Sequence, residues 1–332
     1  MKPPLFFAMA ALFGFSLLGL PVGLCAQTLD APSAVEMGAA KGAAKTDAPA
    51  PAEPAMTAPA NGYYANSEAA MAFADRIAEK DQIDRDWLRA TIGQARFSAA
   101  AQRLMRPSQG AFFKNWRTYR SRFVEPIRIN AGVRFWRANR ETLERAEREF
   151  GVPVEVILGI LGVETIDGRD MGNFRVMDSL ATLAFDFPKT PGRDRSAFFQ
   201  NELEVFLVHA YRAGQDPFEA RGSYAGAMGM GQFMPSSIAQ FAVDYDGDGV
   251  IDLAHSPADA IGSVANYFKS YGWQPGKVAL FDVKLDPAKV NLGVLLAPDI
   301  LPSFRPEQLT AAGLELPQAA QDYKGLLALI EL

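Results

Sequence analysis

The chain has 332 residues, of which 49% are hydrophobic and 21% charged, and its formal net charge is −5. These values are typical of one large or two modest globular domains, and they exclude the strong overall positive charge of most nucleic-acid-binding proteins. Arginines are dense only between Lys114 and Arg148, where they alternate with glutamates at helical spacing. That pattern favours a solvated helical face, and the alternative is a surface that faces a polyanion.

The N-terminus has the features of an export signal. A lysine precedes an apolar run over residues 5–20, which is too short for a membrane span and is followed by proline and glycine. Cleavage after Ala26 would remove residues 1–26 and release the protein into the periplasm. The alternative is lipidation of Cys25 and attachment to the outer membrane, but Leu24 stands where a lipidation motif needs a small residue. Cys25 is the only cysteine, so an internal disulfide is impossible.

Residues 27–62 are rich in Ala and Pro and contain almost nothing to bury, so we expect a disordered tether. Ordered sequence begins near Tyr63, and apolar residues then recur at helical spacing as far as residue 275. Ser67, Gly151 and Pro153 supply helix start and stop signals. We predict helices over residues 67–81, 84–97, 140–151, 153–165, 178–187, 196–214 and 257–273, and a strand over 277–285 where apolar and polar residues alternate.

Glu164 ends the apolar helix predicted over 153–165, in the stretch "ILGILGVETIDGRDMG". Burial and the negative end of the helix dipole would both raise the pKa of its carboxyl, and no basic residue is adjacent in sequence. A carboxylic acid that stays protonated near neutral pH can act as a general acid. The alternative is a structural glutamate that is bonded to the backbone or to an arginine.

The stretch "GSYAGAMGMGQFMPSS" is a glycine-rich loop over residues 222–237. It is not a phosphate-binding loop, because no strand precedes it and no Lys-Ser/Thr pair follows. Its small residues would let the backbone approach a flat ligand closely, and the alternative is a tightly packed turn.

The stretch "DYDGDGVID" has the spacing of a calcium loop, with Asp244, Asp246 and Asp248 at positions 1, 3 and 5. Val250 would offer its carbonyl at position 7, and Asp252 stands at position 9. Position 12 is a histidine instead of a bidentate glutamate, and such Asp/Gly clusters also form plain turns. The sequence has only two histidines, which makes a Ser-His triad or a histidine zinc site improbable.

Taken in order, "GVET", "MGNFRVMDSLATLAFDFP", "GSYAGAMGMGQFMPSS", "DYDGDG" and "DAIGSVANYFKSYGW" resemble the lytic murein transglycosylase B family over residues 63–275. The resemblance implies a mainly α fold with a lysozyme-like catalytic core. It implies cleavage of the β-1,4 bond between N-acetylmuramic acid and N-acetylglucosamine in peptidoglycan, with a 1,6-anhydro product. The family's single catalytic glutamate falls on Glu164, which would act first as acid and then as base. Asp167 and Asp170 lie in a predicted turn, and we expect neither to act.

The resemblance also carries over substrate-binding positions, namely Tyr119, Arg195, Ser223, Gln232, Phe233 and Tyr267, with Met234 beside them. Extra residues in "KTPGRDRS" leave Arg193 as an alternative to Arg195. The family's last calcium ligand falls on Asp259, and the implied calcium is structural, with no cofactor needed for catalysis. The expected partner is the peptidoglycan glycan strand, with no nucleic acid, and the expected state is a monomer.

The family closes with a segment of aromatic residues and an asparagine that returns to the groove, whereas this sequence ends at "LLALIEL". We therefore expect residues 276–332 to form a small strand-containing subdomain that is incomplete relative to the family. Two other functions stay open on this ground: a weakly active or non-catalytic wall-binding protein, and a muramidase that uses water.

Overall fold

The computed structural model describes residues 63–106, 115–189 and 194–331. In these ranges the chain forms fourteen helices and two strands of two residues each, which confirms the prediction of a mainly α fold. The predicted export signal, the tether over 27–62 and Arg193 lie outside the described residues. Within the described ranges, no helix is long and apolar enough to cross a membrane.

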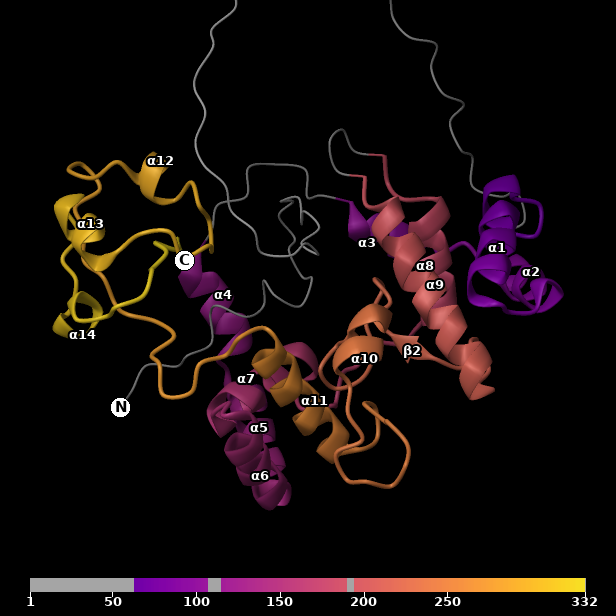
Figure 1. Cartoon of the computed structure of the whole chain (residues 1–332), viewed down its shortest axis with the longest axis horizontal. Coiled ribbons are helices and arrows are strands. Elements are labelled where there is room, and N and C mark those ends of the chain that lie inside the picture. The colour runs from indigo at the N-terminus through magenta and orange to yellow at the C-terminus, as the bar shows by residue number, and fades with distance from the viewer. Residues whose placement is uncertain (1–62, 107–114, 190–193, 332) are drawn as a thin grey trace, which may run out of the picture.

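One group of helices contains α1 (Glu68–Asp81), α2 (Arg85–Gln94), α3 (Ala99–Met105), α8 (Val176–Phe185) and α9 (Ser196–Ala213). Helix α1 packs on α2, and α8 packs on α9 and α3. Their apolar faces share one core, which includes Phe73, Ile77, Leu88, Leu180 and Leu203. In Figure 1, α1 and α2 lie at the right of the molecule, beside α8 and α9.

A second group contains α5 (Pro126–Ala138), α6 (Arg140–Phe150), α7 (Val154–Thr165), α10 (Pro235–Phe241) and α11 (Pro257–Ser270). Helix α7 contacts α5, α6 and α11, so it is the central helix of the group (Figure 1). Its buried residues join those of α6 and α11 in a second core, which includes Leu143, Ile157, Leu161, Val264 and Phe268.

The predicted helix signals act as expected. The Ser67 side chain accepts the backbone N–H of Ala70 at the start of α1. Gly151 ends α6 in the left-handed conformation at φ 72°, which glycine adopts at little cost. Pro153 then stands at the N-cap of α7. These local signals fix where α7 starts, and therefore place Glu164 at its opposite end.

A two-stranded antiparallel pairing joins β1 (Phe174–Arg175) to β2 (Arg221–Gly222), with Phe174 opposite Gly222. The backbones approach very closely here, because a Cβ on Gly172 would lie 2.3 Å from the carbonyl oxygen of Gly222. Only glycine fits this contact. The pairing holds the glycine-rich loop, which follows β2, against the segment that follows α7.

The C-terminal part contains α12 (Leu292–Leu295), α13 (Pro306–Ala311) and α14 (Gln318–Gln321) around a small core. The strand predicted over 277–285 is wrong: this segment is extended and pairs only at Lys284, which forms an isolated bridge with Glu315. Alternation of apolar and polar residues is a local signal, whereas a strand also needs a neighbour along its length. Val278 and Leu280 are 58% and 44% exposed, whereas Val283 and Leu285 pack against the small core, so only the second half of the segment is covered.

Candidate active site

Glu164 lies in the last turn of α7, and the chain then reverses through a left-handed turn. Ile166, Asp167 and Gly168 have φ values of 55°, 56° and 84°. A β-branched residue in this region is strained, so the surrounding structure must hold it there. Thr165 supplies part of that hold, because its buried hydroxyl donates to the carbonyl of Met230 at 2.8 Å and accepts the N–H of Gly168 at 2.8 Å. The end of α7 is thereby fixed to the glycine-rich loop.

The Glu164 carboxyl has the properties of an acid that titrates near neutrality. Burial raises its pKa to about 7. Its Oε1 atom is shielded from solvent and has no hydrogen-bond partner in the part of the chain that the structure describes. A purely structural glutamate would be bonded through such an atom to backbone or arginine. The geometry therefore favours a general acid over the structural alternative.

Tyr119 lies near Glu164, as the resemblance implied. It is on α4 (Trp116–Phe123), where its ring stacks on that of Phe123 at 4.3 Å. Burial raises the pKa of the Tyr119 hydroxyl, and the negative charge of Glu164 raises it further. A carboxylate whose charge raises the pKa of a hydroxyl is close to it in space, so α4 and α7 contribute to one site.

Asp167 is more buried than the sequence indicated. Both carboxyl oxygens are shielded and lack hydrogen-bond partners among the described residues. Burial raises the pKa of this carboxyl to about 6, against an opposing effect from the charge of Arg134. The side chain lies against α5, since a Cβ on Gly132 would be 3.7 Å from its Oδ2 atom. The glycines that face it, Gly132 on α5 and Gly162 on α7, are the sequence signal that could have revealed this pocket for a carboxyl.

The glycine-rich loop is held by its own polar groups. The Ser223 hydroxyl accepts the N–H of Ala227 at 3.0 Å. Gln232 is 5% exposed, has a φ of 51°, and donates its side-chain amide to the carbonyls of Met171 at 3.2 Å and Gly229 at 3.0 Å. Both of these hydrogen bonds stabilise the loop. The side-chain oxygen of Gln232 is then the atom that can accept a hydrogen bond from a ligand.

Phe233 and Tyr267 are core residues in this structure, with exposed fractions of 1% and 5%. Their rings meet edge to face at 5.8 Å. They support the loop from behind, and Met234, which is half-buried, is nearer the surface.

Arg195 stands at the N-cap of α9, with its guanidinium 4.5 Å from the centre of the Phe198 ring. Burial lowers the pKa of Arg195, and the charge of Glu202 opposes this effect. Glu202 was not predicted. It is buried on α9 and accepts the N–H and the hydroxyl of Ser236, near the end of the glycine-rich loop. The structure thus brings Glu164, Tyr119 and the loop together, and connects Arg195 to the loop through Glu202.

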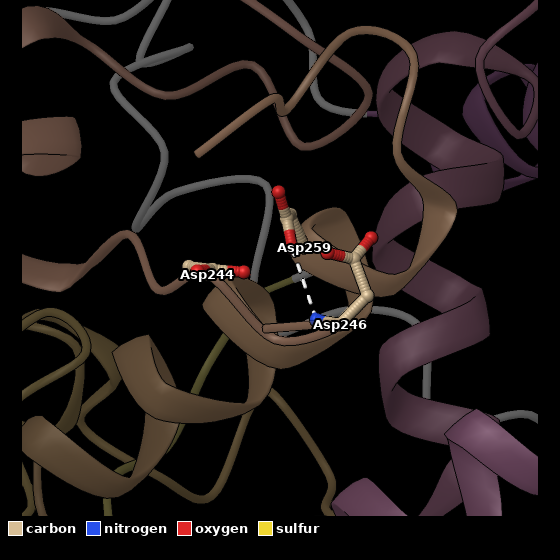
Figure 2. A group of neighbouring side chains, drawn as sticks. All are labelled: Asp244, Asp246 and Asp259. Carbon is tan, nitrogen blue, oxygen red and sulfur yellow. Dashed lines mark hydrogen bonds between the residues drawn. The ribbon is translucent and has the colours of Figure 1, made fainter. Parts of the chain in front are cut away.

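Three of the six predicted metal ligands lie together. Carboxylate oxygens of Asp244, Asp246 and Asp259 are all within 4.8 Å of one another (Figure 2). Asp259 is fully buried at the start of α11, and it accepts the N–H of Tyr245 at 2.7 Å and of Asp252 at 2.8 Å. Three hard oxygen donors suit a calcium ion.

The other predicted ligands lie outside this group. The Asp248 carboxylate accepts the N–H of Val250 at 2.8 Å, and the Asp252 carboxylate accepts the N–H groups of Ala254 and His255 at 2.9 Å. All three hydrogen bonds are of the kind by which aspartates stabilise turns. The cluster thus contains Asp244 and Asp246, which the short-range spacing indicated, and Asp259, which the resemblance indicated.

Comparison with known proteins agrees with this geometry. The model of the family described as "Transglycosylase SLT domain" matches residues 65–330. The membrane-bound lytic murein transglycosylase B of Escherichia coli K12 is 45% identical over 224 residues, which are 65% of this chain and 60% of that protein. The chain thus spans about 60% of the length of that relative.

Solved structures show the same fold. The E. coli lytic transglycosylase Slt35 in complex with calcium is 41% identical, with a TM-score of 0.68 over 81% of this chain and 82% of that chain. SltB3 from Pseudomonas aeruginosa, in complex with NAG-anhNAM-pentapeptide, is 28% identical, with a TM-score of 0.61 over 75% of this chain and 66% of that chain. These neighbours confirm the lysozyme-like fold that the resemblance implied.

Proposed function

The chain belongs to the transglycosylase SLT domain family, and from that membership we propose that it is a lytic transglycosylase of peptidoglycan. It cleaves the β-1,4 bond between N-acetylmuramic acid and N-acetylglucosamine and forms 1,6-anhydro ends. The observation that carries this proposal is Glu164, a carboxyl with a pKa of about 7 whose Oε1 atom has no partner among the described residues. The SltB3 complex with an anhydro-muropeptide supports the same product class.

One carboxyl suffices for this reaction. Protonated Glu164 gives its proton to the glycosidic oxygen as the bond from that oxygen to the sugar carbon breaks. The resulting carboxylate accepts the proton of the sugar's own 6-hydroxyl, whose oxygen closes on the same carbon. Glu164 is protonated again at the end and no water is consumed. The raised pKa suits both steps, because the group can donate and accept near neutral pH.

Side chains around Glu164 would bind and orient the glycan. Tyr119 lies within the electrostatic reach of Glu164 and orients the acid. Ser223 accepts a backbone N–H and keeps its own O–H to donate to an acetamido group. The side-chain oxygen of Gln232 accepts from a sugar hydroxyl or amide, and Met234 lines the wall that Phe233 and Tyr267 support. Arg195 binds at the far end of the groove.

A calcium ion would stabilise the loop over 244–259. Asp244, Asp246 and Asp259 would hold it directly, and the family relative Slt35 has been solved in complex with calcium. Asp248, the carbonyl of Val250 and Asp252 would complete the shell by local adjustment. The ion would tie the loop to α11 and has no part in the proton transfers. Export to the periplasm, as a monomer, is consistent with the N-terminal signal and with a relative named as membrane-bound.

A muramidase that uses water is the second candidate, and Asp167 is the observation that favours it. A second carboxyl with a raised pKa follows Glu164 by three residues, and hydrolases of glycosides need such a second carboxyl to activate water or form an intermediate. Digestion of purified peptidoglycan followed by mass analysis separates the candidates. Anhydro ends support the transglycosylase, reducing ends support the muramidase, and binding without release supports a wall-binding protein.

A further inference from the structure

A cavity of about 540 Å³ lies between α2 and the C-terminal end of α9. Helix α2 lies at the right edge of the molecule and α7 near its middle, so this cavity is separate from the site around Glu164 (Figure 1). Its volume is in the range of sites that bind small molecules. Its chemistry is set by three aromatic rings, two amides and one carboxylate, from Trp87, Tyr211, Phe218, Gln94, Gln215 and Asp216.

The aromatic residues offer surface to a ligand. The rings of Trp87 and Tyr211 meet edge to face at 4.9 Å, and Tyr211 is 38% exposed. Such rings stack against flat apolar faces, which pyranose rings present through their C–H groups. Gln94 and Gln215 are exposed beside them and can both donate to and accept from hydroxyl and acetamido groups.

The charged residues that line the cavity indicate which class of ligand it can bind. No lysine, arginine or histidine occurs among the described residues that line it, so an anion would find no cationic partner. The single carboxylate, Asp216, already accepts the N–H of Phe218 at 2.8 Å, and one carboxylate does not make a metal site. With anions and metal ions excluded, the cavity fits a neutral ligand that has hydroxyls, amides and apolar faces.

The cavity wall is preorganised, and the chain that forms it leads on to the glycine-rich loop. Gly214 ends α9 in the left-handed conformation, and the N–H of Gln215 donates back to Ala210 at 2.9 Å. Arg221 then holds the wall, because its guanidinium donates to the carbonyls of Phe218 at 2.7 Å and Glu219 at 2.8 Å. Arg221 also begins β2, which leads directly into the glycine-rich loop. A rigid wall loses little entropy when a ligand binds.

We propose that this cavity is a second glycan-binding site, which takes N-acetylated sugar units of peptidoglycan at a point remote from the bond that is cleaved. The inference rests on the proposed function, since the polymer that the cavity would bind is the substrate of the Glu164 site. When one site holds the polymer, the effective concentration of the same polymer at the other site rises. The cavity would thus keep the enzyme on the insoluble wall between cleavages.

The test compares variants of the full chain in the Glu164→Gln background, which leaves the wall intact during a binding measurement. Tyr211→Ala removes an exposed ring, and Gln94→Ala removes an exposed amide without touching the core. Trp136→Ala is the matched control, because Trp136 is also 38% exposed and lies on α5, outside the cavity. In sedimentation with purified peptidoglycan, we expect roughly tenfold weaker binding for Tyr211→Ala, less for Gln94→Ala, and no change for the control. Binding by both cavity variants that equals that of the parent overturns the proposal.

Two further readouts separate this site from the catalytic one. With Glu164 restored, Tyr211→Ala should raise KM on intact peptidoglycan while kcat stays unchanged, and both constants should be unchanged on a short soluble fragment. Titration with the soluble tetramer of N-acetylglucosamine should change the fluorescence of the parent more than that of Trp87→Phe, which lacks the cavity tryptophan. This titration tests whether the cavity binds sugar even if the wild-type chain releases nothing from peptidoglycan. Absence of release would refute only the proposed function. Equal fluorescence changes in both proteins overturn the proposed site.

Discussion

The Glu202 carboxylate on α9 accepts two hydrogen bonds from Ser236, one from its backbone N–H at 2.8 Å and one from its hydroxyl at 2.6 Å. Glu202 is 1% exposed, and Ser236 lies in the first turn of α10, directly after the loop that carries Gln232. The contact therefore joins the two helix groups at the wall of the candidate groove. It also satisfies two donors at the start of α10 that would otherwise be buried without partners.

We expect Glu202→Ala to lower the free energy of unfolding by about 2–4 kcal/mol, because it removes the acceptor and leaves both Ser236 donors unsatisfied. Glu202→Gln keeps one acceptor oxygen and should cost less. Urea unfolding measures both, with Glu79→Ala, an exposed glutamate on α1, as the control. A loss for Glu202→Ala no larger than that for the control would show that the contact contributes little.

Glu164→Gln should abolish release of peptidoglycan fragments while the fold survives. The amide has nearly the same size but cannot donate an acidic proton, and loss of general acid–base catalysis costs about 10²–10⁴-fold. Glu155→Gln makes the same chemical change in the first turn of the same helix, where the side chain is exposed, and should keep full activity. Turbidity loss of peptidoglycan suspensions measures the rate, and circular dichroism checks the fold. Turnover by Glu164→Gln above roughly a tenth of wild type would remove Glu164 from the mechanism.

The activity should fall as the pH rises through about 7, because the Glu164 carboxyl must be protonated to act as the acid and its pKa is about 7. The corresponding limb should appear in kcat/KM, which reports the free enzyme. Tyr119→Phe removes a neighbour of Glu164 without changing the burial that raises its pKa, so the position of this limb should stay close to that of wild type. A limb near pH 4.5, the ordinary value for a glutamate, would contradict the burial of the acid.

The position of Glu164 could be predicted from sequence because its causes are local. An apolar run, a proline at its start and a glycine before it define α7, and the acid follows as the last charged residue of that helix. The burial of Asp167 could not be predicted in the same way, since it depends on Gly132 of α5, a helix far away in sequence. The strand over 277–285 failed for the same reason: its alternation is local, but its partner would have to come from elsewhere.

The metal loop combines residues that a local pattern predicts with one whose position depends on the packing of a distant helix. Asp244 and Asp246 are two residues apart and were visible from spacing, whereas the grouping of Asp259 with them depends on how α11 packs behind the loop. The cavity at α2 and α9 is wholly non-local, because Trp87 and Tyr211 meet only when α2 packs beside α9. No periodicity in either helix distinguishes those two rings from ordinary core residues.

Asp167→Asn should make the protein more stable at pH 7–8 than the parent. The gain should shrink as the pH falls from the folded pKa of about 6 to 3.8, the ordinary value for an aspartate. The sign follows from linkage: the folded state holds the proton more tightly than the unfolded state, so this group's contribution to stability is lost as the pH rises through 6. With a discount for solvent screening of the partly exposed side chain, the expected effect is about 1 kcal/mol. Because asparagine also tolerates the left-handed conformation better than aspartate, the pH dependence of the difference is the readout. Thermal melts of both proteins from pH 4 to 8 measure it, and parallel curves would contradict a buried, proton-binding Asp167.

Calcium should raise the melting temperature without entering the rate law. An ion that binds only the folded state stabilises it by about 2.7 kcal/mol at a hundredfold excess over Kd. Asp244→Ala with Asp248→Ala should erase this shift, and so should Asp259→Ala. The two differ without calcium: Asp259 accepts the N–H groups of Tyr245 and Asp252 from a fully buried position, so its loss should also lower the melting temperature of the metal-free protein. Calorimetry with calcium and with a chelator measures the melting temperature of the parent and of both variants. If the calcium shift survives in Asp259→Ala at full size, the ion binds elsewhere, and if a chelator slows glycan cleavage at a temperature where the protein stays folded, the ion takes part in the reaction.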